Sequence, residues 1–327
     1  MKKIFVIMVL MLLSLQGFAS QYGSGQILKV SDISKVNQYA NREAVVTAKR
    51  AKELIEKSED IVVFDVRKSF LFATGHIPGA VDIWESDITA DKGDYDFEGM
   101  RASKEKIGKL LSDYGVRSHT KILIYDANGN YDSARLWWIL TLYGHKNISL
   151  IDGGLQGWKS SKLPLKYGFS KRRNRFNYIF VRREDHSKYA DLKLVKAMVG
   201  SRRGVILDTR SKDEYTGVTT KKGAYRGGRI PKSEYMPWGS AVYLDKNELS
   251  YSKNHKGRMK KFKTLKELKK IYGKYRGQRI IAYDQSGIGS AHTTFVLTQL
   301  LGYRNVKNYD GSWIEWSYHK ELEIEKN

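Results

Sequence analysis

The stretch IIAYDQSGIGSAHT, from Ile280 to Thr293, reads as a strand, a loop and the start of a helix in immediate succession. Ile280 to Tyr283 are apolar and β-favouring, which predicts a short buried strand. The residues after Asp284 are small or polar and include two glycines, which predicts a tight loop before the helix. Because ligands of open α/β sheets bind beyond the carboxyl ends of the strands, Asp284 is a candidate site residue.

The same succession occurs earlier in the chain, with three other blocks that are repeated in the same order. Asp126 ends the run ILIYD as Asp284 ends IIAYD, and Asp152 and Asp310 each follow 26 residues later. The other repeated blocks are IVVFDVR (61–67) with VILDTR (205–210), GHIP (75–78) with GRIP (228–231), and GHKNISLIDGGLQGW (144–158) with GYRNVKNYDGSWIEW (302–316). The duplication and the chain length together predict two domains.

Each copy alternates short β-rich runs with segments of helical period, such as Ser133 to Tyr143 and Ala291 to Leu301. This alternation predicts an α/β fold with two tandem domains, each a parallel sheet flanked by helices. Residues 166–185 follow Pro164, are basic and lack an apolar period, which predicts a linker. We expect a first domain at 20–165, a basic linker at 166–185 and a second domain at 186–327.

The N-terminus MKKIFVIMVLMLLSLQGFAS combines two lysines, an apolar run and then small residues that suit a signal peptidase. Residues 1–19 are therefore predicted to be a cleaved signal peptide, and the mature protein to be exported to the periplasm or secreted. The alternative is a membrane anchor, which needs about 20 apolar residues.

Composition excludes several kinds of chemistry. The chain has no cysteine, which excludes disulfides, thiolate metal sites and a cysteine nucleophile. The seven histidines are scattered singly, so no metal site is expected. Neither a nucleotide-binding glycine pattern nor a G-x-S-x-G nucleophile turn is present, and no cofactor is expected. A phosphoryl-transfer site of the haloacid-dehalogenase type would need a second aspartate where Ser286 stands.

The formal net charge of +23 is concentrated in the second half of the chain, since residues 20–165 sum to about +1 and residues 166–327 to about +20. Such a charge attracts anionic partners, such as a lipid surface, an acidic protein or small oxyanions, although it equally fits a solubilising surface. Lys256 to Arg279 reads as an amphipathic helix with one face packed and one lysine-rich face. No reader motif for specific nucleic-acid binding is present.

The four repeated blocks together are specific enough to identify a family. D-x-R, then G-H-I-P-G-A, then the strand with its loop and helix, then D-G-G-x-x-x-W, twice in one chain, resembles a tandem-domain rhodanese of the thiosulfate or 3-mercaptopyruvate sulfurtransferase type. The resemblance runs from about Val45 to Trp316. It implies that the first domain is a structural, non-catalytic copy and that the second carries the chemistry.

The resemblance also implies a cysteine at position 284, where this chain has Asp284. In this family a thiolate accepts a sulfane sulfur, holds it as a persulfide and passes it to an acceptor. We hypothesise that Asp284 stands in the nucleophile position as a permanent anion, hydrogen-bonded by the amides of the degenerate loop 284–290. Besides Asp284, that loop consists of Gln285, Ser286, Gly287, Ile288, Gly289 and Ser290.

Other candidate residues lie around this loop. The resemblance implies that Arg226 holds the substrate anion, and the alternative is a solvated arginine in a basic loop. Ser286 matches a serine of mercaptopyruvate-type loops but also suits the turn geometry. Asp208 and Arg210 are interpreted as paired charges that fix a strand end. Arg229 replaces the histidine of the G-H-I-P block and adds a positive charge near the site or at the surface.

Two functional hypotheses remain open from the sequence. The first is an exported pseudoenzyme of the sulfurtransferase family that holds a small anion or a protein partner. The second is an active sulfurtransferase, with thiosulfate or 3-mercaptopyruvate as donor, in which Arg226 and the loop amides bind a sulfur oxyanion and Asp284 acts as a general base without a protein cysteine.

Overall fold

The computed structural model describes residues 33–58, 60–170, 174–202, 204–243 and 260–326. The chain divides into two compact units, 1–38 and 39–327, and everything below concerns the second. The predicted signal peptide lies outside the described residues. In the part of the chain that is described, no helix combines the length and the apolar character that a membrane-spanning segment requires.

The second unit contains two five-stranded sheets that are parallel throughout and share one strand order, β1-β5-β4-β2-β3 in the first and β6-β10-β9-β7-β8 in the second. The strands of the first sheet are β1 (Val45–Val46), β2 (Ile61–Asp65), β3 (Ala80–Asp82), β4 (Lys121–Tyr125) and β5 (Ile148–Ile151), and those of the second are β6 (Tyr189–Ala190), β7 (Gly204–Asp208), β8 (Glu234–Tyr235), β9 (Arg279–Tyr283) and β10 (Val306–Tyr309). The predicted α/β fold with two duplicated domains is confirmed.

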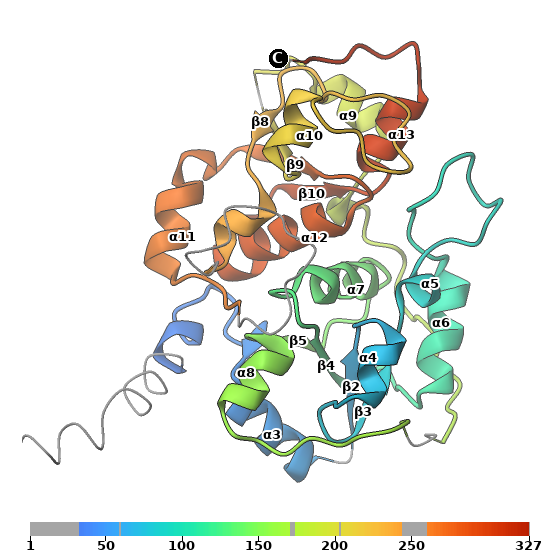
Figure 1. The fold of residues 1–327 in the computed structure, drawn as a ribbon, viewed down its shortest axis with the longest axis vertical. Helices are drawn as coiled ribbons and strands as arrows, with labels where there is room; N and C mark the ends of the chain where they lie inside the picture. The colour runs from blue at the N-terminus through green and yellow to red at the C-terminus, as the bar shows by residue number, and fades with distance from the viewer. Residues whose placement is uncertain (1–32, 59, 171–173, 203, 244–259, 327) are drawn as a thin grey trace, which may run out of the picture. The chain divides into compact units, whose positions relative to one another are not determined.

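Helices connect the strands in both halves, as parallel pairing requires. In the first half these are α3 (Ala48–Lys57), α4 (Ser69–Ala73), α5 (Glu85–Ile88), α6 (Lys104–Asp113), α7 (Tyr131–Leu142) and α8 (Gly154–Ser160), and in the second α9 (Leu192–Met198), α10 (Lys212–Thr216), α11 (Leu265–Tyr272), α12 (Ile288–Phe295) and α13 (Ser312–Tyr318). Short 3-10 turns lie at His186–Lys188, Trp238–Ala241 and Gly273–Tyr275, and a π-helical turn at Val296–Leu300 directly continues α12. Figure 1 shows α7 and α12 side by side between the two sheets.

Each sheet has apolar side chains on both faces, which is why its central strands are buried along nearly their whole length. In the first domain, alternate residues such as Leu123 and Tyr125 pack with Trp158 of α8. In the second, Ile281 and Tyr283 pack with Trp313 of α13. The opposite faces are covered by α7 and α12, so these two helices place the loops that precede them at the centre of the unit.

The basic helix expected from Lys256 to Arg279 is shorter than predicted. Its residues 256–259 lie outside the described part, and α11 begins only after Thr264. The side chain of Thr264 accepts from the backbone N–H of Glu267, and the side chain of Glu267 accepts from that of Thr264. Phe262 does not belong to the helix because its backbone pairs with Val242 and donates to the carboxylate of Asp152 in the other domain. The apolar spacing of Phe262 therefore reflects a tertiary contact and not a helical face.

Candidate functional site

The loop between β9 and α12 wraps around the carboxylate of Asp284. Asp284 follows the last residue of β9 and is 3% exposed. Its Oδ1 accepts hydrogen bonds from the amides of Ser286 at 3.2 Å and Gly287 at 2.6 Å, and its Oδ2 accepts one from the amide of Gly289 at 2.8 Å. Three backbone donors thus point at a single side chain, which is the arrangement that binds an anion at the start of a helix.

Hydroxyl groups from three directions close the remaining space around this carboxylate. The hydroxyl groups of Ser290 and Ser312 lie 3.3 and 3.4 Å from Oδ1, and that of Tyr131, from the first domain, lies 3.4 Å from Oδ2. A Cβ atom on Gly289 would lie only 3.0 Å from Oδ2. The loop therefore fits closely around a carboxylate, and the amides of Ser286, Gly287 and Gly289 find their acceptor within the chain itself.

The first domain contains a similar arrangement around Asp126, although the amides that donate stand at partly different positions of the loop. This carboxylate is 1% exposed and accepts hydrogen bonds from the amides of Asn128, Asn130, Asp132 and Ser133 at 2.8 to 3.1 Å. The similarity predicted from the two repeated runs therefore extends to hydrogen bonding. Two aspartates occupy the same place in two copies of one fold.

Two arginines of the first domain hold the second domain's loop through Asp310. The Asp310 carboxylate is fully buried and lies 2.6 Å from Arg135 of α7 and 2.9 Å from Arg101. Arg135 also donates to the carbonyl of Gly287 at 3.2 Å. Two cations around one buried carboxylate offset its desolvation cost, so this network fixes the loop against the first domain.

The two domains also cover each other's loops in a reciprocal manner. In the first domain, Thr89 pairs with Arg101, and Gly99 between them packs so closely that an added Cβ would lie 2.9 Å from that of Ser286. In the second domain, Lys260 packs against Gly129 of the first loop in the same way. The segment 89–101 of the first domain therefore covers the 284–290 loop of the second domain, and Lys260 of the second domain covers the loop of the first domain that contains Gly129.

A small cavity of about 40 Å³ remains beside the two loops, enough for a few water molecules. It is lined among others by Trp84, Glu85, Asp132, Ser286 and Ile288, and Asp284 does not line it. Burial raises the pKa of Asp132 well above its usual range, and the neighbouring carboxylates of Asp126 and Glu85 add to this effect. The cavity thus touches the edge of the 284–290 loop without reaching its carboxylate.

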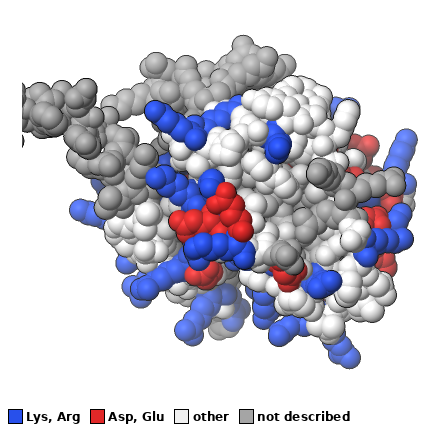
Figure 2. All heavy atoms as spheres, turned by 90° about the horizontal axis from the view of Figure 1, so that it is seen from below, with Lys and Arg blue, Asp and Glu red and all other residues white. Residues whose placement is uncertain are grey.

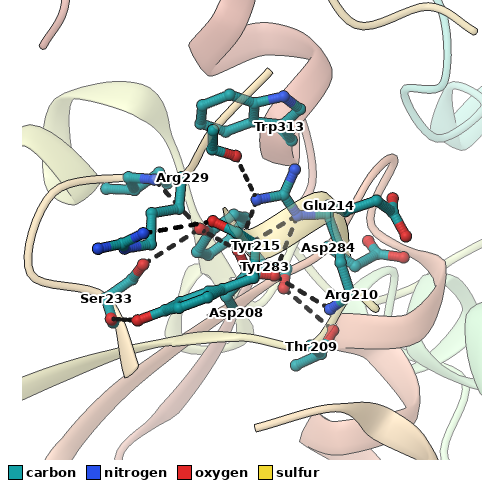
Figure 3. A network of polar contacts seen from close by, with 12 residues as sticks. Asp208, Thr209, Arg210, Glu214, Tyr215, Arg229, Ser233, Tyr283, Asp284 and Trp313 are labelled. Atoms are coloured by element: carbon teal, nitrogen blue, oxygen red, sulfur yellow. Dashed lines mark hydrogen bonds and ion pairs between the residues drawn. The ribbon is translucent and has the colours of Figure 1, made fainter. Parts of the chain in front are cut away.

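The charges at the strand ends are paired. Arg210 lies 2.5 Å from Asp208, donates to the carbonyl of Gly228 at 2.8 Å and stacks on Trp313. Tyr283 donates to the same aspartate at 2.5 Å (Figure 3). Arg67 and Asp65 repeat this pattern in the first domain. The observed contacts are those of a structural pair that ties the strand end to the G-R-I-P loop.

The side chain of Arg226, from the segment between α10 and β8, reaches the C-terminal end of α13. Its guanidinium donates to four backbone carbonyls, those of Ser317, His319, Lys320 and Leu322, at 2.9 to 3.4 Å. Carbonyl groups at a helix end are the acceptors that a cation satisfies best. These contacts serve the end of α13, and the role of Arg226 in anion binding stays a prediction.

Arg229 and Gln285 also contact other segments of the second domain. Arg229 stacks on Tyr215 and lies 3.2 Å from Glu325, near the C-terminus. Gln285 donates to the carbonyl of Lys222 at 3.2 Å and so connects the 284–290 loop to the segment that precedes Arg226.

Sequence reasoning missed Arg101, Arg135 and Tyr131. They belong to the first domain, and nothing in the sequence places them across the interface from a loop more than 150 residues away. Asp310 offered a signal, because it stands at the same place in its repeated block as Asp152. No group of residues suited to hold a metal ion was found among those that the structure describes.

Comparison with known proteins agrees with this architecture. Residues 47–161 and 191–319 match the model of the rhodanese-like domain. A thiosulfate sulfurtransferase of Corynebacterium glutamicum is 30% identical over 305 residues, which cover 88% of this chain and 92% of that protein. The sulfur carrier protein TtuD of Thermus thermophilus is 32% identical over 291 residues, 85% of this chain and 95% of that protein. The crystal structure of YnjE superposes with a TM-score of 0.74 at 20% identity over 88% of this chain and 70% of that chain.

Proposed function

Because the chain belongs to the rhodanese family and contains no cysteine, we propose that it is a non-catalytic member of this family that acts as a binding module. The observation that carries this proposal is the carboxylate of Asp284, which accepts the amide hydrogen bonds of the loop. In a persulfide mechanism those donors would stabilise a thiolate or the charge on a bound sulfur group.

A carboxylate cannot carry out the reaction that the thiolate performs in this family. A persulfide step needs a thiolate that attacks the outer sulfur of the donor, so that a new S–S bond forms while the donor's own bond to that sulfur breaks and the rest of the donor leaves; an acceptor then attacks the outer sulfur and releases the thiolate. Asp284 would also repel an incoming sulfur oxyanion, since two like unit charges about 4 Å apart cost on the order of 4 kcal/mol at an effective dielectric constant of 20. Both effects favour a loop that is kept for its structure.

The binding role is assigned to the basic second half of the chain. A charge of about +20 on residues 166–327 favours an anionic partner, either an acidic protein or a small sulfur oxyanion or carboxylate. Figure 2, which views the molecule from the side of the first domain, shows Lys and Arg side chains scattered around a compact group of Asp and Glu. Export to the periplasm or the medium, with removal of residues 1–19, belongs to the same proposal.

The test is a sulfur-transfer assay with thiosulfate or 3-mercaptopyruvate as donor and cyanide as acceptor. We expect no turnover by the wild type above a protein-free control, and measurable turnover by Asp284→Cys, because the loop amides that would stabilise a thiolate are in place. Asp213→Cys, which places a thiol on the exposed face of α10, controls for the mere presence of a cysteine. Wild-type turnover would refute the proposal and favour the alternative of a cysteine-independent sulfurtransferase.

A further inference from the structure

A row of four aromatic rings crosses from the first domain to the second at the surface. Tyr95 and Phe97 belong to the loop between α5 and α6, Tyr318 ends α13, and Tyr225 precedes β8. Consecutive ring centroids are 6.0 Å apart for Tyr95 and Phe97, 5.8 Å for Phe97 and Tyr318, and 5.1 Å for Tyr318 and Tyr225. Tyr95 is 43% exposed and Tyr225 is 50% exposed, so the row presents ring surface to solvent.

Backbone contacts on both sides hold this row in place. The α5–α6 loop is closed at its base by the pairing of Thr89 with Arg101, and Figure 1 shows it extending beside α13. Gly99 of this loop and Gly223 of the second domain both pack against Ile314, which lies on the same helix, α13, as Tyr318. The rings are therefore pre-positioned, and a ligand does not bear the entropic cost of ordering them.

Carboxylates alternate with the rings along the same loop. Asp94, Asp96 and Glu98 are exposed, and no ion pair within the described residues involves any of them. Asp91 of the same loop, by contrast, is paired with Lys106 at 2.7 Å. In a chain with 58 Lys and Arg against 35 Asp and Glu, a run of three carboxylates that form no ion pair with any described residue is a local reversal of charge.

We propose that this surface, formed by Tyr95, Phe97, Tyr225 and Tyr318 with the adjoining Asp94, Asp96 and Glu98, binds an extended basic segment of a partner protein. A guanidinium or ammonium group packs on an aromatic face, and a carboxylate beside the ring pairs with the same cation. Because ring and acid alternate from Tyr95 to Glu98, successive basic side chains of one segment meet both kinds of group. Four rings in a row exceed the reach of one side chain, which favours a peptide over a small cation.

The net charge of +23 does not oppose this assignment at short range. At physiological ionic strength the Debye length is about 8 Å, so a bound cation responds mainly to the loop carboxylates and little to distant lysines. An anionic lipid or an acidic peptide would meet three like charges at this surface. This inference does not depend on whether the protein transfers sulfur.

The experiment measures the fluorescence anisotropy of a labelled eight-residue peptide of alternating arginine and glycine, titrated with the mature protein at physiological salt. We expect saturable binding that weakens by about tenfold in the triple variant Asp94→Asn, Asp96→Asn, Glu98→Gln. Glu53→Gln, Glu56→Gln, Glu105→Gln is the matched control, since it removes three exposed carboxylates from α3 and α6 and changes the net charge equally. We expect this control to weaken binding less than about twofold.

A single change in the other domain gives a second readout. Tyr225→Ser removes the ring at the far end of the row and should weaken binding about threefold, with urea unfolding checked for all variants. Equal weakening by both triple variants, or no saturable binding of the arginine peptide, would overturn the inference. Stronger binding of a glutamate–glycine peptide, or of phosphatidylglycerol vesicles, that depends on Tyr95 and Tyr225 would also overturn it. The sulfur-transfer assay of Asp284→Cys reports on the proposed function separately.

Discussion

Glu315, in the repeated block 302–316, shows how one buried carboxyl group constrains the residues around it. A Cβ atom on Gly311 would lie 2.0 Å from Oε2 of Glu315, so only glycine leaves room for this side chain. Burial raises the pKa of Glu315 to about 7, with a further contribution from Asp310 and Asp191, while Tyr309 acts in the opposite direction. The packing of this block therefore depends on a carboxyl group whose pKa lies near neutral pH.

Glu315→Gln should change how stability depends on pH. The folded-state pKa lies above the ordinary value of 4.5, so the native wild type binds more protons, and its stability falls as pH rises from about 4.5 to about 7. The variant lacks this loss, and we expect it to exceed the wild type by on the order of 2 kcal/mol at pH 8 and to match it near pH 4.5. Urea unfolding at the two pH values measures this, with the exposed Glu321→Gln as control. A difference independent of pH would contradict the prediction.

At the scale of elements, the two loops and the helices that follow them form the centre of the unit. The predicted runs at 122–126 and 280–284 correspond to β4 and β9 within one residue, because short apolar runs bounded by loop residues carry a strong local signal. The first turn of α7 and the contacts of Arg135 could not be predicted. They depend on the pairing of α7 with α12, which brings together residues far apart in sequence.

Arg135→Met tests the energetic weight of that contact. It keeps the helical propensity and much of the volume but leaves Asp310 buried with Arg101 alone, so we expect a loss of about 3 kcal/mol in the free energy of unfolding. Arg50→Met on α3 removes an ion pair of similar length, 2.9 Å, whose side chains are more than half exposed, and should cost less than about 0.5 kcal/mol. Equal losses in the free energy of unfolding, measured by urea titration, would show that the buried network stabilises the protein no more than an exposed ion pair does.

At the scale of the whole unit, each domain completes the other. The sequence predicted two copies of one fold, and the residues at their strand ends, from the order of the repeated blocks. It did not predict that each domain would cover the loop of the other. The contacts of Gly99 with Ser286 and of Lys260 with Gly129 join chain segments that share no sequence pattern. Such contacts follow from packing alone.

Reciprocal closure predicts that both domains unfold together. We expect one thermal transition with equal calorimetric and van't Hoff enthalpies, and coincident curves by far-UV circular dichroism and tryptophan fluorescence. The reason is that α7 and α12 share a buried surface, in which Trp137 meets Phe295 edge-on at 4.8 Å. Two separated transitions would mean that the interface adds little to either domain. The control is the same measurement on Arg135→Met, whose transition should move to lower temperature without splitting.

The aspartate inside the 284–290 loop has one more consequence, which concerns chemical durability. A low-pKa thiolate in such a loop would be open to peroxide, and its oxidation beyond the sulfenic acid stage is mostly irreversible. A carboxylate held by the same amides has no such oxidation ladder and needs no reductant to maintain it. The loop of this protein therefore keeps its hydrogen bonds unchanged through oxidative conditions that would inactivate a cysteine-bearing relative.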